Sequence, residues 1–372
     1  MTRPHILYGL PHSLYTGPAR AYLRKQRVDF VERSPRDPEF AGHVLPAIGR
    51  SIIPVLVTAE GQIVQDSVDI IDHFEATGAR LSAYPEGPRQ RFVAHLLQLF
   101  GSQGLLRAAM HYRWTYYDQQ AAFLDHAFAA GGPPGAAQNV MRRMQSYLPG
   151  LGVREETIPL IEQGFADLLV ALEAHLSVHP YLLGGRPSIG DYGLFGPLYA
   201  HLGRDPVPGD IMKRTAPATY RWIERLHAPD LDIPDHPEAD GWLADDAVPE
   251  SLEAVVMEMG REMGPELADK LAYLEAHYER TAPADGEPVS AKPHQRTLGL
   301  TASRYRGVPD QVGVQPYLLY VVQRSAAALS ELTGADHVWA TDLLSRAGLD
   351  GIGASRQARV DRRNHIEVWA RG

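Results

Sequence analysis

The sequence predicts an α/β domain at the N-terminus, an all-helical domain after it, and an α+β extension at the C-terminus. The chain has 372 residues, too many for one ordinary domain. Short apolar runs alternate with helical patterns over the first 78 residues, the pattern is helical from about 89 to 227, and an acidic, proline-rich stretch then precedes further helices. We expect the three units at residues 1–82, 83–235 and 236–372.

The amino-acid composition of the chain argues against several classes of function. Hydrophobic residues make up 44% and charged residues 22% of the chain, as in a folded protein. A net charge of -9 argues against a nucleic-acid partner, which usually binds a basic face. The start lacks a secretory signal and no run approaches the roughly 20 apolar residues that span a bilayer, so we expect a cytoplasmic protein with no membrane partner. The absence of cysteine excludes disulfides and a protein thiol nucleophile.

The first half of the N-terminal domain contains two strand patterns around a helix. The run HILYGL, residues 5–10, is typical of a short buried strand, and ARAYLRKQR, residues 19–27, favours a helix. VDFVERS, residues 28–34, is a second strand pattern. A strand, a helical crossover and a strand favour a right-handed parallel pair.

The second half of this domain predicts a hairpin and a helix. IPVLVT and QIVQ are two strands joined by AEG, and DSVDIIDHFEATG is a helix with Asp66 or Ser67 as its cap and Gly78 as its stop. With a short helix before the hairpin, the order is strand, helix, strand, helix, strand, strand, helix. This is the thioredoxin-like order.

Three pieces of this domain carry a more specific resemblance. They are Ser13 in HSLYTGPAR, Ile53 and Pro54 in SIIPVL, and Asp66 and Ser67 in QDSVDIIDHFE. The chain resembles the glutathione S-transferases, in which a Ser, Tyr or Cys lies beside the glutathione sulfur, a cis-proline precedes the third strand, and an acidic-Ser pair starts the third helix. The resemblance implies a thioredoxin-like domain followed by the all-α domain of that family.

It also implies glutathione as co-substrate and a set of binding residues. Ile53, before a cis Pro54, would pair its backbone with the cysteinyl part of the ligand. The helix N-terminus and the Ser67 hydroxyl would bind the γ-glutamyl carboxylate, while Asp66, shorter than the usual glutamate, would accept from the amino group, with Gln65 beside it.

The candidate catalytic residues are hydroxyls near the first helix. The thiolate is the nucleophile, so the site must lower the pKa of the glutathione thiol. Ser13 is the first candidate, Thr16 the second, and Tyr15 and Tyr8 follow. Leu14 stands where many Ser-type members have proline.

Two motifs stand out in the helical domain. Ser188, followed three residues later by Asp191, resembles the capping box of a core helix in the same family, a structural role. The run LLRAAMHYRWTYY could line the binding site of a second substrate, or it could simply pack one helix against its neighbours. The candidate pocket residues there are Arg107, His111, Tyr112 and Trp114.

The extension predicts two helices, near residues 252–278 and 316–332, and a final strand-like run at 358–369. Arg359, Arg362 and Arg363 in that run are expected on the exposed face of the strand, in preference to an anion site.

The leading hypothesis is a glutathione transferase-like enzyme of detoxification type that adds the thiolate to a small electrophile, as a homodimer. One alternative is a non-catalytic binding or scaffold protein whose extension covers the cleft or recruits a partner. Another is a glutathione-dependent isomerase, lyase or ether-cleaving enzyme.

Overall fold

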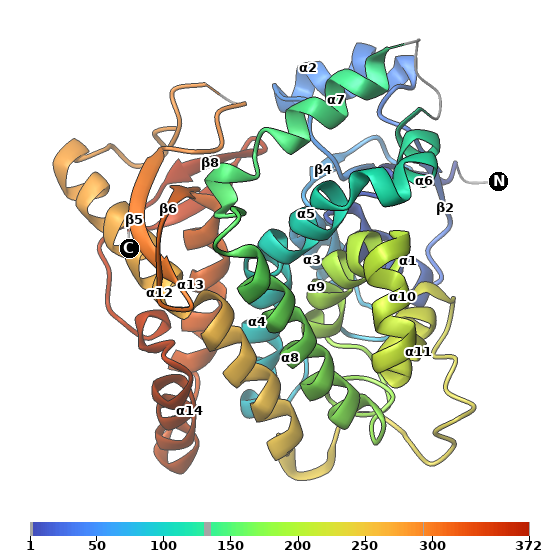
Figure 1. The fold of residues 1–372 in the computed structure, drawn as a ribbon, viewed down its shortest axis with the longest axis vertical. Helices are drawn as coiled ribbons and strands as arrows, with labels where there is room; N and C mark the ends of the chain where they lie inside the picture. The colour runs from blue at the N-terminus through green and yellow to red at the C-terminus, as the bar shows by residue number, and fades with distance from the viewer. Residues whose placement is uncertain (1–2, 130–134, 293, 372) are drawn as a thin grey trace.

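The computed structural model describes residues 3–129, 135–292 and 294–371, and Figure 1 shows the chain from N- to C-terminus. The extension forms one flank of the molecule, and the helices of the middle of the chain lie in the centre and on the opposite flank (Figure 1). In the described part of the chain, no helix is long and apolar enough to cross a membrane.

A four-stranded sheet with the order β2-β1-β3-β4 organises the N-terminal domain. β1 (His5–Tyr8) pairs in parallel with β2 (Phe30–Arg33). β3 (Val55–Val57) pairs antiparallel with β1 and with β4 (Ile63–Gln65). The predicted parallel pair and hairpin are both confirmed.

Helices cover both faces of this sheet. Leu7 belongs to a core shared with α1 (Thr16–Lys25) and α3 (Ser67–Ala76), whereas Ile6 packs with α2 (Leu45–Ile48) on the opposite face. Successive residues of a strand point to opposite faces, so this short apolar strand is buried on both sides.

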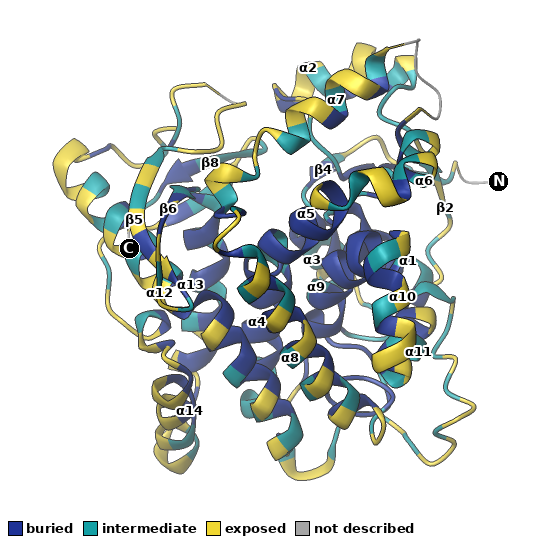
Figure 2. Cartoon of the chain, in the orientation of Figure 1, coloured by how far each residue is buried: buried dark blue, intermediate teal, exposed yellow. Residues whose placement is uncertain are grey.

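Eight helices follow in the described part of the second domain. They are α4 (Pro88–Leu99), α5 (Leu106–Thr115), α6 (Tyr117–Ala129), α7 (Ala136–Gln145), α8 (Ile158–Leu176), α9 (Ile189–Pro197), α10 (Pro206–Thr215) and α11 (Pro217–His227). Figure 2 shows α4 and α9 buried at the centre, while α7 has a largely exposed surface.

Helix α9 begins with the predicted capping box. The Ser188 N–H donates to Oδ2 of Asp191 at 2.8 Å, and the Asp191 N–H donates to the Ser188 hydroxyl at 3.4 Å. Farther along α9 the backbone is in close contact with the end of α4, because a Cβ on Gly101 would lie 2.2 Å from the carbonyl oxygen of Gly193. Glycine at that position permits the central helices to cross.

The extension contains three helices and two hairpins in its described residues. They are α12 (Glu250–Thr281), β5 (Gly299–Tyr305), β6 (Val308–Val314), α13 (Tyr317–Ser330), α14 (Gly334–Ala347), β7 (Val360–Arg363) and β8 (Ile366–Trp369). α12 packs along α8, and α13 packs against α4. The apolar side chains of the extension belong to the same core as those of the other two units.

The two predicted helices of the extension are confirmed as α12 and α13, but the prediction of a single final strand is wrong. The run at 358–369 is a hairpin that turns at Asn364 and His365, which have φ angles of 51° and 66°. These residues adopt the left-handed conformation that a tight turn requires, and Asn tolerates it better than most. The predicted domain boundaries lie in the segments between α3 and α4 and between α11 and α12, and they stay predictions.

Candidate functional site

A cavity of about 580 Å³ including its open mouth lies between the N-terminal domain and the extension. Tyr15 lines it just before α1, Ile53 just before Pro54, and Asp66 just before α3. The Ile53–Pro54 bond is cis, as predicted. The remaining lining residues are Arg50, Ile52, Gln103, Ser290, Gln295, Arg296, Gln315, Pro316, Tyr317 and Glu367.

A second, more apolar cavity of about 390 Å³ lies beside the first. Tyr15 and Tyr317 line both cavities, so the two spaces adjoin at these rings. The other lining residues of the second cavity are Leu14, Pro18, Ser67, Val68, Ile71, Gln98, Gly101, Ser102, Gly193 and Pro197.

Asp66 caps the N-terminus of α3. Its backbone has a φ of 95°, and its Oδ1 accepts a hydrogen bond from the Val68 N–H at 2.9 Å. This geometry confirms the predicted cap and directs the carboxylate toward the first cavity. Ser67, the first residue of the helix, faces the second cavity.

The four candidate hydroxyls occupy different places. Ser13 accepts from the Thr16 N–H at 3.2 Å and stays outside both cavities. Thr16 is fully buried against Gly9, where an added Cβ would lie 2.2 Å from the Thr16 Cγ2. Tyr8 is fully buried on the far face of the sheet. The structure therefore brings Tyr15, and none of the other three, to the cavities.

The electrostatic surroundings of Tyr15 keep its hydroxyl protonated. Burial raises the pKa of Tyr15 and the Asp66 carboxylate adds to this, while the positive charge of Arg296 lowers it. Because the net shift of the pKa is upward, the hydroxyl is a hydrogen-bond donor at neutral pH.

Two of the predicted pocket residues form polar contacts, one with the extension and one within the helical domain. Arg107 pairs with Glu266 and stacks on the ring of Tyr305 at 4.0 Å. His111 is fully buried and lies 3.1 Å from Oε1 of Glu162. Neither residue lines a cavity.

The other two pack in the apolar interior. The Tyr112 ring lies 5.1 Å from that of Phe165, and Trp114 packs 5.6 Å from Phe128, measured between centroids. Both are almost fully buried and outside the cavities. All four residues thus pack against neighbouring side chains, and none of them lines either cavity.

Arg113 is the residue of α5 that reaches the loop before α1. Its guanidinium pairs with the buried Asp205 at 2.6 and 2.8 Å and donates to the carbonyl oxygen of His12 at 2.9 Å. Since His12 lies three residues before Tyr15, this buried ion pair anchors the loop that carries Tyr15.

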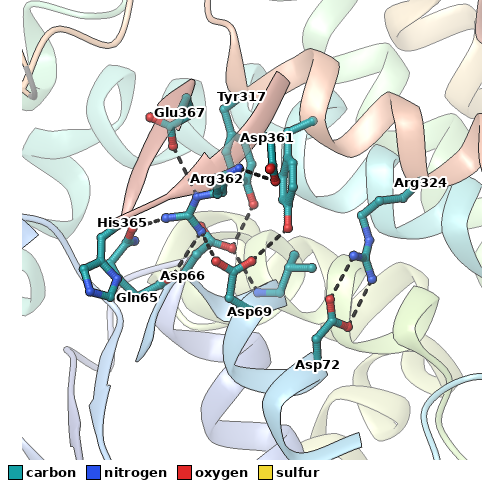
Figure 3. A network of polar contacts seen from close by, with 12 residues as sticks. Gln65, Asp66, Asp69, Asp72, Tyr317, Arg324, Asp361, Arg362, His365 and Glu367 are labelled. Atoms are coloured by element: carbon teal, nitrogen blue, oxygen red, sulfur yellow. Dashed lines mark hydrogen bonds and ion pairs between the residues drawn. The ribbon is translucent and has the colours of Figure 1, made fainter. Parts of the chain in front are cut away.

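The extension meets α3 through a matched row of polar side chains (Figure 3). Three acidic residues, spaced one helical turn apart, each contact one residue of α13. The Tyr317 hydroxyl donates to Asp66 at 2.9 Å, the Tyr320 hydroxyl donates to Asp69 at 3.0 Å, and Arg324 pairs with Asp72 at 2.9 and 3.1 Å.

The final hairpin adds a buried cation beside the same helix. The Arg362 side chain is only 4% exposed, and it donates to the Gln65 carbonyl oxygen at 3.0 Å and to Asp69 Oδ2 at 2.6 Å. Its prediction as an exposed residue is therefore wrong, because the hairpin folds back onto α3, where Asp69 compensates the buried charge. Arg359 and Arg363 are exposed, as predicted.

Gln65 and Arg50 complete this cluster. Gln65 is buried, and its side-chain oxygen accepts from Arg362 and, at 3.2 Å, from Arg50. Arg50 pairs with Glu367 at 2.8 and 3.0 Å. The only sequence signal for these contacts was an acidic residue at every third position, Asp66, Asp69 and Asp72. A helix cap requires only the first of them.

A mixed four-stranded sheet with a cis-proline before its third strand, joined to a helical domain with a capped central helix, defines a two-domain protein with a thioredoxin-like first domain. Residues 7–80 match the family model described as the glutathione S-transferase N-terminal domain, and residues 155–225 match that of the C-terminal domain. These two regions of the chain thus match the two domains of the glutathione S-transferase family.

Solved structures similar to this chain include the glutathione transferase GSTFuA3 from Phanerochaete chrysosporium, with 18% identity and a TM-score of 0.44 over 62% of this chain and 98% of that one. The beta-etherase LigF from Sphingobium sp. strain SYK-6 has 19% identity and a TM-score of 0.42 over 61% and 96%. The transferase URE2P6 from Phanerochaete chrysosporium, solved with oxidized glutathione, has 16% identity and a TM-score of 0.36 over 63% and 94%. No curated protein matches the chain.

Proposed function

We propose that this protein binds glutathione in the first cavity and activates its thiol for attack on a small electrophile. The observation that carries the proposal is the convergence of Tyr15, Ile53 and Asp66 on one cavity from three separate segments of the N-terminal domain. These are a hydroxyl donor, the residue before a cis-proline, and a carboxylate at a helix N-terminus.

The groups that would hold glutathione have free bonding capacity. No described residue hydrogen-bonds the backbone N–H or C=O of Ile53, so an extended peptide can pair with it. Oδ2 of Asp66 likewise has no partner in the described ranges and can accept from an ammonium group. The N-terminus of α3 suits a carboxylate, with the Ser67 hydroxyl on the side of the adjoining second cavity.

Activation of the thiol requires a modest stabilisation of the thiolate. A free thiol titrates near 8.5, and lowering its pKa by two units takes about 2.7 kcal/mol. A hydrogen bond to a charged acceptor contributes about 1.5–3 kcal/mol. One donated hydrogen bond from Tyr15 is of the required size.

In the reaction that we propose, the thiol proton leaves to water and the Tyr15 hydroxyl donates to the sulfur anion. The sulfur forms a bond to an electrophilic carbon, and the leaving group departs with its electron pair. The apolar second cavity, which adjoins at Tyr15, suits the body of an aromatic or aliphatic electrophile. Among the candidate hydroxyls we place Tyr15 ahead of Ser13 and Thr16, because Tyr15 alone lines the cavities.

Titration calorimetry with glutathione and turnover of 1-chloro-2,4-dinitrobenzene test this function together. We expect binding in the millimolar range or tighter and release of chloride as the thioether forms. No heat of binding at millimolar glutathione would refute the proposal.

A non-catalytic binding protein is the second candidate. The contacts of Tyr317 and Arg362 beside Asp66 favour it, because the extension covers part of the site. Glutathione binding without turnover of any electrophile would support this role. Turnover that releases a product without consuming glutathione would instead indicate an isomerase or lyase, and cleavage of an aryl ether would indicate an etherase.

The assembly and location of the protein belong to the same proposal. The family resemblance implies a homodimer in the cytoplasm that takes part in detoxification. Sedimentation of the full chain, with a mass near twice 41.0 kDa as the expected result, tests the dimer.

A further inference from the structure

The extension changes the charge around Asp66, the proposed acceptor for the ammonium group of glutathione. Arg362 is buried beside Asp66 and Asp69, and these two carboxylates raise its pKa although burial opposes them. The guanidinium therefore stays charged. Its field partly neutralises Asp66, so an ammonium group gains less there than beside an isolated carboxylate.

The hydrogen-bonding capacity of Asp66 is also partly used. Its Oδ1 accepts from both the Val68 N–H and the Tyr317 hydroxyl, each at 2.9 Å. Tyr317 lines the same cavity as Asp66, so its ring borders the place proposed for the amino-acid end of a ligand. Figure 3 shows Tyr317 and Arg362 reaching the start of α3 from the extension.

The other charged groups that line the cavity do not restore a preference for a cation. Glu367 from the extension pairs with Arg50 of the N-terminal domain. Arg296, also from the extension, lines the cavity and has no carboxylate partner in the described part of the chain. Among the described residues around the cavity, the extension thus brings Arg296, Arg362, which pairs with Asp69, and Glu367, which pairs with Arg50. The donors for a carboxylate, Ser67 and the N-terminus of α3, remain.

We infer that this site prefers a thiol ligand whose end at α3 is a carboxylate without a neighbouring ammonium group. The inference rests on the proposed function, that an extended thiol peptide lies beside Ile53, and it names the ligand class more narrowly. Glutathione binds, but its amino group contributes little. A carboxylate-terminated thiol peptide without that amino group is the better ligand.

Calorimetry with two ligands tests the inference. Glutathione is compared with glutaryl-cysteinylglycine, which lacks only the α-amino group. We expect the second ligand to bind at least as tightly as the first. If glutathione binds about tenfold more tightly or better, as one charged hydrogen bond would give, the inference fails while the proposed function stands. If neither ligand binds, the proposed function itself fails.

Variants show whether the extension sets the preference. Tyr317→Phe removes one of the two hydrogen bonds that Oδ1 of Asp66 accepts, and Arg362→Met removes the buried charge. Each should shift the affinity ratio toward glutathione, by about tenfold for a charged hydrogen bond gained. Arg359→Met, an exposed arginine of the same segment outside the cavity, should leave the ratio unchanged. Tyr317→Phe keeps the aromatic ring, so this variant still tests the inference if Arg362→Met does not fold. An unchanged ratio in Tyr317→Phe overturns the inference.

Discussion

The Tyr317 hydroxyl donates a hydrogen bond to Oδ1 of Asp66 at 2.9 Å, across 251 positions of sequence. It joins the first turn of α13 to the residue that caps α3. Because α13 also packs its apolar face against α4, the extension is held by both polar and apolar contacts. The proposed binding of glutathione and the docking of the extension therefore share Asp66.

Tyr320→Phe and Arg324→Met should lower the free energy of unfolding. Each removes a partly buried bond to a carboxylate of α3, and we expect a loss of about 1–2 kcal/mol. Urea unfolding followed by circular dichroism measures it. Arg359→Met is the control and should change the free energy by less than about 0.5 kcal/mol. Equal effects of all three variants would mean that the contacts with α3 do not hold the extension.

Tyr15→Phe should reduce turnover about 10- to 100-fold, because the thiolate loses a hydrogen bond worth about 1.5–3 kcal/mol. The ring stays in place, so glutathione affinity should change little. Ser13→Ala is the matched control, since its hydroxyl accepts from a backbone N–H and faces no cavity. A larger loss of turnover in Ser13→Ala, with binding intact, would return the catalytic role to Ser13.

Much of the N-terminal domain could be predicted because its signals are local. The apolar run at β1, the hairpin turn between β3 and β4, and the cap at Asp66 each occupy a few adjacent residues. The β5–β6 hairpin was missed because its strands are exposed at alternate positions and Pro309 interrupts the second.

The shape of the site could not be predicted from local patterns. Arg362 lies 297 positions after Gln65, and no periodicity within the last strand distinguishes a buried arginine from an exposed one. Arg362 is buried because the turn at Asn364 and His365 folds the hairpin back and because the carboxylate of Asp69 accepts a hydrogen bond from its guanidinium. For a similar reason the sequence favoured Ser13 over Tyr15 as the candidate catalytic hydroxyl. The direction of a side chain in a loop depends on tertiary contacts, such as the hydrogen bond from Arg113 to the His12 carbonyl oxygen.

Arg296→Gln should raise the pKa of the bound glutathione thiol by about 0.5–1 unit, because a cation near the sulfur favours the thiolate. Arg296 lines the cavity with Tyr15, and its charge lowers the Tyr15 pKa. The ultraviolet absorbance of the thiolate, followed against pH in the complex, measures the shift. Arg296→Lys should retain most of the effect, and Arg359→Gln should show none. The same thiol pKa in Arg296→Gln and the unmodified protein would exclude this role.

Stability should fall as the pH drops from about 6.5 toward 4, and His175 should account for part of the slope. His175 is fully buried, lies 2.9 Å from the Leu182 carbonyl oxygen through Nε2, and meets the Ser251 hydroxyl at 2.8 Å through Nδ1. Burial lowers its pKa to about 4, and the neighbouring His179 adds to this. Above pH 6.5 the ring is neutral in both the folded and unfolded chain, so its contribution to stability is complete.

Below pH 6.5 the unfolded chain takes up a proton that folded His175 does not bind until the pH approaches 4. The free energy of unfolding therefore falls, by at most about 1.4 kcal/mol per pH unit for this one group. His175→Gln should reduce the slope of the free energy of unfolding against pH between pH 6 and 4.5 by the contribution of up to one proton. This change in slope does not depend on how the substitution alters the absolute stability. His337→Gln, on an exposed position of α14, should keep the slope of the unmodified chain. Because His175 bridges the end of α8 to Ser251 at the start of α12, an unchanged slope in His175→Gln would mean that the junction opens and admits the proton before the chain unfolds.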